Sequence, residues 1–351
     1  MTPNASTAVE FAKVNIVFGN APDKALPLMD QGQDRSTINA ATGQVLGVHD
    51  CSLTVATGEI LVLMGLSGSG KSTLLRAVNG LNPVCRGEVR VRTAKGMTSV
   101  TKADPETLRG IRQTTVAMVF QQFGLLPWRT VRDNVGLGLE LRGQDAATRR
   151  ARVDEELALV NLSDRAEALV GQLSGGMQQR VGLARAFATD APILLMDEPF
   201  SALDPLIRAR LQDELLDLQA KRNRTIIFVS HDLDEAFKLG DRIALMEGGR
   251  IVQIGTAREI FSNPVSDYVA DFVNHMNPLA VLTARDALVD GAGIIPATGE
   301  TTAETPIREV MARLRGETRA LNVTDGATTI GTISRESVLQ RLLNPRGNIR
   351  D

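Results

Sequence analysis

The sequence predicts an α/β fold with helices covering both faces of a sheet, and two observations carry that prediction. Short apolar runs recur along the chain and indicate buried strands at residues 60–65, 116–120, 193–196, 225–230 and 242–246. Because both faces of each run are apolar, the runs suit a sheet that is covered on each side. Helical patterns such as residues 71–81 and 207–222 separate many of the runs. Alternation of strand and helix is typical of an α/β core.

Two stretches depart from this alternation. Residues 132–172 have a mostly helical pattern, and we interpret them as the centre of a helical subdomain, about residues 124–190, inserted into the α/β core. Near the end of the chain the pattern changes again, and we place a boundary there between a domain of residues 1–278 and a C-terminal region of residues 279–351. Within that region, residues 305–343 predict helix, strand, turn, strand and helix, a small α+β unit.

Composition narrows the classes of protein. With 351 residues the chain is long enough for two domains, and its net charge of −2 gives no basis for nucleic-acid binding. The two cysteines, Cys51 and Cys85, suggest neither a disulfide framework nor a zinc site. No apolar run approaches the roughly 18 residues that span a bilayer, and the start lacks the apolar core of a signal peptide. We therefore expect a cytosolic protein, with docking onto a membrane protein left open.

A phosphate-binding loop is predicted at residues 65–73, "GLSGSGKST". The stretch fits G-x-x-x-x-G-K-[ST], with Gly65, Gly70, Lys71 and Ser72 at the fixed positions, and it lies between a predicted strand and a predicted helix. Such a loop points successive backbone N–H groups inward, and the following helix adds its positive end. Lys71 can then reach the β- and γ-phosphates, and the Ser72 hydroxyl is placed to bind Mg²⁺. The other loop residues expected at the nucleotide are Ser67, Gly68, Ser69 and Thr73.

Two further strands end in polar side chains. Asp197 and Glu198 follow the run at 193–196, and His231 follows the run at 225–230. After a phosphate loop, we expect Asp197 to hold Mg²⁺ through water and Glu198 to polarise the attacking water. A lone histidine is usually structural, but strand ends in such sheets gather around the ligand, so His231 is expected to contact the γ-phosphate.

Six motifs in fixed order resemble the ATP-binding subunit of an ABC transporter over residues 9–275. They are "GLSGSGKST", "MVFQQFGLLP", "LSGGMQQR", "ILLMDEP", "SALD" and "FVSHD". The resemblance implies a P-loop ATPase core with a mixed sheet, and ATP and Mg²⁺ as cofactors. It also implies that Gln121 senses the γ-phosphate and Mg²⁺, that Asp204 lies at a dimer interface, and that Phe18 stacks on adenine. For Phe18, an ordinary place in the core is the alternative.

The stretch "LSGGMQQR" contains almost no reactive group. In the family that it resembles, the turn at Ser174, Gly175 and Gly176 opens a helix facing the γ-phosphate held by a second copy of the chain. A helix start offers free N–H groups and partial positive charge, and glycines permit close backbone approach. An ordinary serine N-cap would have the same local geometry. A second copy of the chain is therefore an expected partner.

Two segments resemble one subfamily, the importers of quaternary amines. One is the insert of residues 20–53, which resembles that subfamily's order of a leucine-rich stretch, "DQG", a short helix and "TG". The other is residues 124–143, which is similar to the choline branch. The resemblance implies choline as the first candidate solute and glycine betaine or proline betaine as the second. It implies transmembrane permease subunits and a periplasmic solute-binding protein as partners, at the cytoplasmic face of the bacterial inner membrane. Trp128 would lie near the permease contact or serve as a packing residue.

The tail is similar to a single cystathionine-β-synthase (CBS)-type repeat, whereas relatives carry such repeats in pairs. A regulatory role and a dimer-stabilising role both stay open for it. A different function for the whole chain, an ABC-type ATPase acting on DNA or the ribosome, is disfavoured. Such chains typically carry two cassettes or a long coiled coil, whereas this one has a single cassette with a short span between Gln121 and Ser174.

Overall fold

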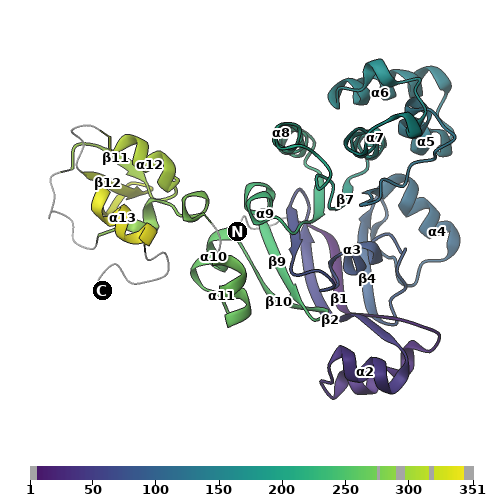
Figure 1. Cartoon of the computed structure of the whole chain (residues 1–351), viewed down its shortest axis with the longest axis horizontal. Helices are drawn as coiled ribbons and strands as arrows, with labels where there is room; N and C mark the ends of the chain where they lie inside the picture. Colours follow the sequence, from purple (N-terminus) through teal and green to yellow (C-terminus); the bar gives the residue numbers. More distant parts are fainter. Residues whose placement is uncertain (1–5, 275–276, 290–296, 316–319, 344–351) are drawn as a thin grey trace. The chain divides into compact units, whose positions relative to one another are not determined.

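The computed structural model describes residues 6–274, 277–289, 297–315 and 320–343. The chain divides into two compact units (Figure 1), one made of Met1–His231 with Ala244–Val252 and the other of Asp232–Ile243 with Gln253–Asp351. The second unit also takes in helices that precede residue 278, so the boundary expected there stays a prediction. Each unit is described by itself below.

A six-stranded sheet forms the centre of the α/β fold, in the order β10-β9-β3-β8-β7-β6. Its strands are β3 (Ile60–Met64), β6 (Val116–Val119), β7 (Ile193–Asp197), β8 (Thr225–Val229), β9 (Arg242–Glu247) and β10 (Arg250–Gly255). The pairs β3/β8, β8/β7 and β7/β6 are parallel, and every residue of these four strands is buried. The predicted buried strands and the α/β fold class are confirmed.

An antiparallel sheet, in the order β2-β1-β4-β5, belongs to the same unit. Its strands are β1 (Thr7–Phe18), β2 (Val45–Ala56), β4 (Arg86–Thr93) and β5 (Gly96–Ser99). Phe18, the last residue of β1, pairs with Val45, the first residue of β2. The helical part of the insert of residues 20–53 lies between these two residues, and the rest of the insert belongs to β2.

Helices border the parallel strands where the sequence predicts them, with small differences in length. The helix α3 (Lys71–Ala77) follows β3, and α8 (Pro205–Arg222) follows β7. The helix α3 ends earlier than predicted, because Gly80 adopts a φ of +66° that a continuing helix cannot accommodate. The remaining short helical elements of this unit are α4 (Pro105–Gly110) and the π-helical turn η2 (Ile111–Thr115).

The predicted helical subdomain is present (Figure 1). Its main helices are α5 (Val131–Leu141), α6 (Ala146–Leu159) and α7 (Gly175–Ala188), joined by the 3-10 turns η3 (Ser163–Arg165) and η4 (Val170–Gln172). Each main helix begins at a side-chain cap: Thr130, Asp145 and Ser174 accept hydrogen bonds from backbone N–H groups of the first turn. Capping therefore fixes where the "LSGG" turn ends and α7 begins.

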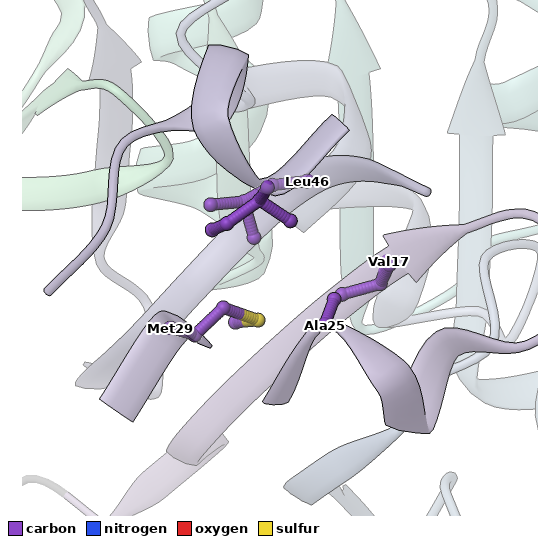
Figure 2. Close-up of a cluster of buried hydrophobic side chains, with 5 residues drawn as sticks. Val17, Ala25, Met29 and Leu46 are labelled. Carbon is purple, nitrogen blue, oxygen red and sulfur yellow. The ribbon is translucent and has the colours of Figure 1, made fainter. Parts of the chain in front are cut away.

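The insert folds into more helix than the single short one expected. It forms η1 (Pro22–Lys24), α1 (Leu26–Asp30) and α2 (Arg35–Thr42), and Gly32, at a φ of +74°, separates α1 from α2. Its apolar side chains share a core with the ends of β1 and β2 (Figure 2), made of Val17, Ala25, Met29, Ile38 and Leu46. The exposed face is tied to β4 by a two-pronged ion pair of Arg86 with Asp30, at 2.9 and 2.8 Å.

The second unit contains short helices and a three-stranded sheet. Its elements before the sheet are α9 (Leu233–Leu239), α10 (Ala257–Ser262), α11 (Asp267–Val273), η5 (Pro278–Ala280) and η6 (Ala284–Ala287). The tail then forms β11 (Glu300–Thr302), α12 (Ile307–Arg313), β12 (Ala320–Asp325), β13 (Thr328–Ser334) and α13 (Arg335–Leu343). The strand β12 pairs in parallel with β11 and antiparallel with β13. The predicted order of helix, strand, turn, strand and helix is confirmed.

The core of the insert makes a testable prediction. Ile38 is fully buried, so Ile38→Ala removes packed methylene groups and leaves a cavity, which should lower the free energy of unfolding by about 2–5 kcal/mol. Leu141→Ala, at a side chain that is 63% exposed, is the control and should change it by less than about 0.5 kcal/mol. Urea denaturation followed by circular dichroism measures both variants. Equal midpoints for the two would contradict the assigned core.

Candidate nucleotide-binding site

A cleft of about 550 Å³ opens at the carboxyl ends of the parallel strands. Residues from the phosphate loop, from the strand ends and from the insert line it together: Phe18, Arg35, Val45, Leu46, Gly47, Ser67, Gly68, Gly70, Lys71, Ser72, Thr73, Gln121, Glu198 and His231. Most of the residues that the sequence predicts at the nucleotide are therefore brought together. Gly65 and Ser69 belong to the same loop, and Asp197 accepts a hydrogen bond from Ser72 of that loop.

The loop conformation depends on its first glycine and on the lysine. Gly65 has a φ of +141°, and a Cβ there would lie 2.1 Å from the backbone oxygen of Met246, so no other residue fits. The buried Lys71 Nζ donates to the carbonyls of Gly65 and Leu66, at 2.8 and 2.9 Å. Burial lowers the pKa of Lys71, while the carboxylates of Glu198 and Asp197 act in the opposite direction. The ammonium of Lys71 thus links the end of the loop to its first two residues.

The buried carboxylate of Asp197 joins the loop to the neighbouring strand. It is fully buried, and its two oxygens have separate partners. Ser72 Oγ donates to Oδ1 at 2.7 Å, and Arg76 Nη2 donates to Oδ2 at 2.8 Å. A buried carboxylate needs such partners because leaving it unpaired costs several kcal/mol. Ser72 and Asp197, which are 125 positions apart in the chain, are thus neighbours, as their shared assignment to Mg²⁺ requires.

Glu198 projects from the end of β7 in an unusual backbone conformation. Its φ of +48° lies in the left-handed region, which non-glycine residues adopt at a cost and which is common at functional sites. Its Oε2 accepts a hydrogen bond from Gln121 Nε2 at 3.1 Å and lies 3.5 Å from His231 Nδ1. The carboxylate thus faces the cleft between the ends of β6 and β8, and His231, 66% exposed, stands at its mouth.

A buried glutamine that the sequence reading did not single out holds this backbone turn. Gln179 of α7 donates from Nε2 to the carbonyl of Glu198 and accepts from the N–H of Ala202, both at 3.1 Å. The hydroxyl of Ser201 donates to the same carbonyl at 3.1 Å. These bonds hold the peptide that follows the left-handed residue. Gln179 belongs to the stretch "LSGGMQQR", which is therefore connected to Glu198 within one chain.

The other end of the cleft contains an exposed aromatic ring and part of the insert. Phe18 is 39% exposed, and a Cβ on Gly47 would lie 2.9 Å from its ring. Arg35, Val45 and Gly47 join it in lining the cleft. None of these three has a sequence signal of its own. Val45 pairs with Phe18 across β1 and β2, Gly47 follows in β2, and Arg35 comes from α2 of the insert.

The "LSGG" turn lies outside the cleft of its own chain. Ser174 and Gly175 are exposed, and a Cβ on Gly175 would meet no atom within 4 Å. Gly176 is tighter, with 3.3 Å from such a Cβ to the carbonyl of Ala202. Asp204 is exposed as the N-cap of α8, and Trp128, 72% exposed, stands clear of the core. The packing of the described residues around position 175 therefore leaves room for a side chain larger than glycine.

The donor set at the loop fits a magnesium ion. Ser72, Asp197 and Gln121 offer a hydroxyl, a carboxylate and an amide oxygen, and the first two are already in contact. Mg²⁺ sites use one or two protein oxygens and complete the shell with phosphate and water, and these donors suit such a site.

The fold and the cleft place this chain in the class of phosphate-loop nucleotide hydrolases. Comparison with known proteins narrows the class: the family model described as "ABC transporter" matches residues 48–201. A glycine betaine/proline betaine transport system ATP-binding protein, ProV, of Escherichia coli (strain K12), is 48% identical over 278 residues, 79% of this chain and 68% of that one. The chain belongs to the family of ABC transporter ATP-binding subunits, and it is an ATPase.

Two further comparisons extend the similarity, one over most of the chain and one to a solved structure. A trimethylamine N-oxide transport system ATP-binding protein, TmoW, of Ruegeria pomeroyi, is 42% identical over 328 residues, which cover 93% of this chain and 94% of that one. A solved ATP-binding cassette, in a dimeric post-hydrolysis state bound to ADP and phosphate, matches with a TM-score of 0.62 and 30% identity over 71% of this chain and 99% of its own. The resemblance in fold thus covers the cassette.

The phosphate loop makes the second prediction. Gly65→Ala places a methyl group against the backbone of Met246, so the loop must shift and ATP affinity should fall by at least about tenfold. Gly110→Ala is the control, because a Cβ there meets no atom within 4 Å and its φ is −58°. ATP titration by calorimetry compares the two. Wild-type affinity in the Gly65 variant would contradict the loop geometry.

Proposed function

We propose that this ATPase energises the import of a small methylated amine, such as a quaternary ammonium compound or an amine oxide, and hydrolyses ATP between two copies of the chain. One observation supports hydrolysis between two copies of the chain. The cleft gathers a phosphate loop and a carboxylate, whereas the exposed "LSGG" turn lies outside it. One chain therefore supplies two different faces of a site.

Within the cleft, each proposed role follows from a position. Lys71 binds the β- and γ-phosphates. Ser72 and Asp197 would hold Mg²⁺ together with Gln121, and the bound ion would offset the charge of the phosphates. Glu198, held toward the cleft by its backbone turn, takes the proton of the attacking water. His231, 3.5 Å from that carboxylate, contacts the γ-phosphate. Phe18 stacks on the adenine ring.

The second copy supplies Ser174, Gly175 and Gly176. These residues open a helix of 14 residues, whose first N–H groups and partial positive charge suit a γ-phosphate. Asp204, exposed at the start of α8, would lie at the interface between the copies. The solved cassette described above is a dimer, which supports this arrangement.

The solute class rests on the relatives. ProV belongs to a glycine betaine/proline betaine transport system and TmoW to a trimethylamine N-oxide transport system. These solutes share a methylated, positively charged nitrogen. Choline, which the resemblance of residues 124–143 favours, stays a prediction beside them. Uptake of each radiolabelled solute by the assembled transporter distinguishes them.

The proposed partners are transmembrane permease subunits, with a periplasmic solute-binding protein acting through them. Trp128 is exposed near the start of the helical subdomain and is proposed to lie close to the permease contact. Within the described residues, no helix has the length and apolar character needed to cross a bilayer. We place the chain peripherally, at the cytoplasmic face of the bacterial inner membrane. For the CBS-like tail, the regulatory and dimer-stabilising roles both stay open.

Replacing Glu198 tests the proposed base. Glu198→Gln keeps the size of the side chain and the hydrogen bond with Gln121 but removes the negative charge, so ATP binding and ATP-dependent dimerisation should persist. Hydrolysis should fall by about 10²–10⁴-fold, the usual contribution of a general base. Phosphate release measures turnover, and size-exclusion chromatography with ATP measures dimerisation. Turnover at the wild-type rate would remove Glu198 from this role.

The second face is tested at Gly175. The space beside it is open in the single chain, so Gly175→Glu should leave the fold and ATP binding by the monomer unchanged. In a dimer the new carboxylate would lie against the partner's γ-phosphate, and hydrolysis should fall below about 1% of wild type, since like charges repel. ATP titration and phosphate release are the two measurements. Loss of ATP binding by the monomer would contradict a role in trans.

A further inference from the structure

Arg35, at the start of the insert helix α2, reaches the phosphate loop. Its Nη1 donates to the carbonyl of Gly68, and its Nη2 donates to the carbonyl of Gly47 at 2.7 Å. The same side chain lines the cleft. One guanidinium therefore bridges the loop that receives phosphate and the strand that lies beside the exposed ring of Phe18.

The fold of the insert places the guanidinium there. Asp34 caps α2 by accepting from the N–H of Thr37 at 2.8 Å, and Ile38, one turn after Arg35, is buried in the insert core. The turn between β9 and β10 leaves room for the side chain, because a Cβ on Gly249 would lie 2.8 Å from Nη2. The buried packing of Ile38 thus positions the helix that contains Arg35. The absence of a side chain at Gly249 leaves the space that the guanidinium occupies.

The bond to Gly68 bears on the backbone conformation of the phosphate loop. Gly68 has a φ of +77°, and a glycine peptide in a loop rotates easily. In a trans peptide the C=O and the following N–H point in opposite directions. A bond that holds the carbonyl of Gly68 therefore also holds the N–H of Ser69 in its direction, toward the carbonyl of Leu66, to which it donates at 3.1 Å within the loop. Charge-assisted bonds of this kind are stronger than neutral ones.

We propose that Arg35 is a positioning residue of the nucleotide site, which holds the phosphate loop in the form that receives a nucleoside polyphosphate and adds positive charge beside it. Together with Lys71 it gives the cleft a second cation for a polyanionic ligand. By bridging Gly47 and Gly68, it also fixes the separation between the ring of Phe18 and the loop. This inference rests on the proposed roles of the cleft residues and extends them to the insert.

Two substitutions at Arg35 test the proposal. Arg35→Gln removes the charge and cannot span both carbonyls, so the Kd for ATP should rise about tenfold, the factor expected for one charge-assisted hydrogen bond. Arg35→Lys keeps the charge without the two-pronged geometry, and its Kd should lie between those of the wild type and the Gln variant. At saturating ATP, kcat of the Gln variant should stay within about twofold of wild type.

A matched control separates this role from simple anchoring of the insert. Arg86→Gln breaks the ion pair with Asp30, which anchors α1, but Arg86 does not line the cleft. Its Kd for ATP should stay within about twofold of wild type. Cys85 packs against the insert core, so its alkylation rate reports opening of the insert. That rate should be unchanged in Arg35→Gln and faster in Ile38→Ala.

The outcomes are distinct. A Kd for ATP in Arg35→Gln within twofold of wild type overturns the proposal. So does an equal loss in Arg86→Gln, or alkylation of Cys85 in Arg35→Gln as fast as in Ile38→Ala, because either result makes Arg35 an anchor of the insert only. If the wild-type chain bound no ATP, the proposed roles of the cleft residues and this inference would fail together. Tight binding by the wild type with the pattern above supports both.

Discussion

Parallel pairing of β3, β8, β7 and β6 is the constraint on which the rest of the structure depends. Because these strands run in one direction, the segments that follow them emerge at the same edge of the sheet. Strands lie about 4.8 Å apart, so short side chains from neighbouring strand ends reach one another. Lys71 and Ser72 follow β3, Glu198 follows β7, His231 follows β8 and Gln121 follows β6. The cleft is the consequence of that alignment.

Two energetically unfavourable features of the fold lie at the same edge. The four strands contain buried apolar side chains until β7 ends in Asp197, whose fully buried carboxylate needs Ser72 and Arg76 as partners. The next residue, Glu198, adopts a left-handed backbone. Such costs, of order 1–3 kcal/mol each, persist only where surrounding contacts impose them. At Glu198 these contacts come from Gln179 of α7 and from Ser201, which both donate to its carbonyl.

Two segments outside the sheet support the cleft. The helix α7 begins at an exposed turn and, one turn later, reaches the backbone of Glu198 through Gln179. The "LSGG" turn is thereby connected to the cleft of its own chain while remaining open to another molecule. The insert contributes on the opposite side: its own small core (Figure 2) holds α2, and α2 brings Arg35 to the loop. The phosphate loop is thus supported from the sheet and from the insert.

The sequence by itself determined the buried strands, the phosphate loop with Lys71 and Ser72, the order of elements in the tail, and the family. These depend on local patterns, because apolar runs, glycine spacing and motif order are properties of short stretches. Tertiary structure alone decided that Arg35, Gly47 and Gln179 meet the site. Their partners are remote: Arg35 bonds Gly68 from 33 positions away, and Gln179 bonds Glu198 from 19. Contacts of this kind follow from how helices and strands pack. They therefore leave no local pattern in the sequence from which they could be predicted.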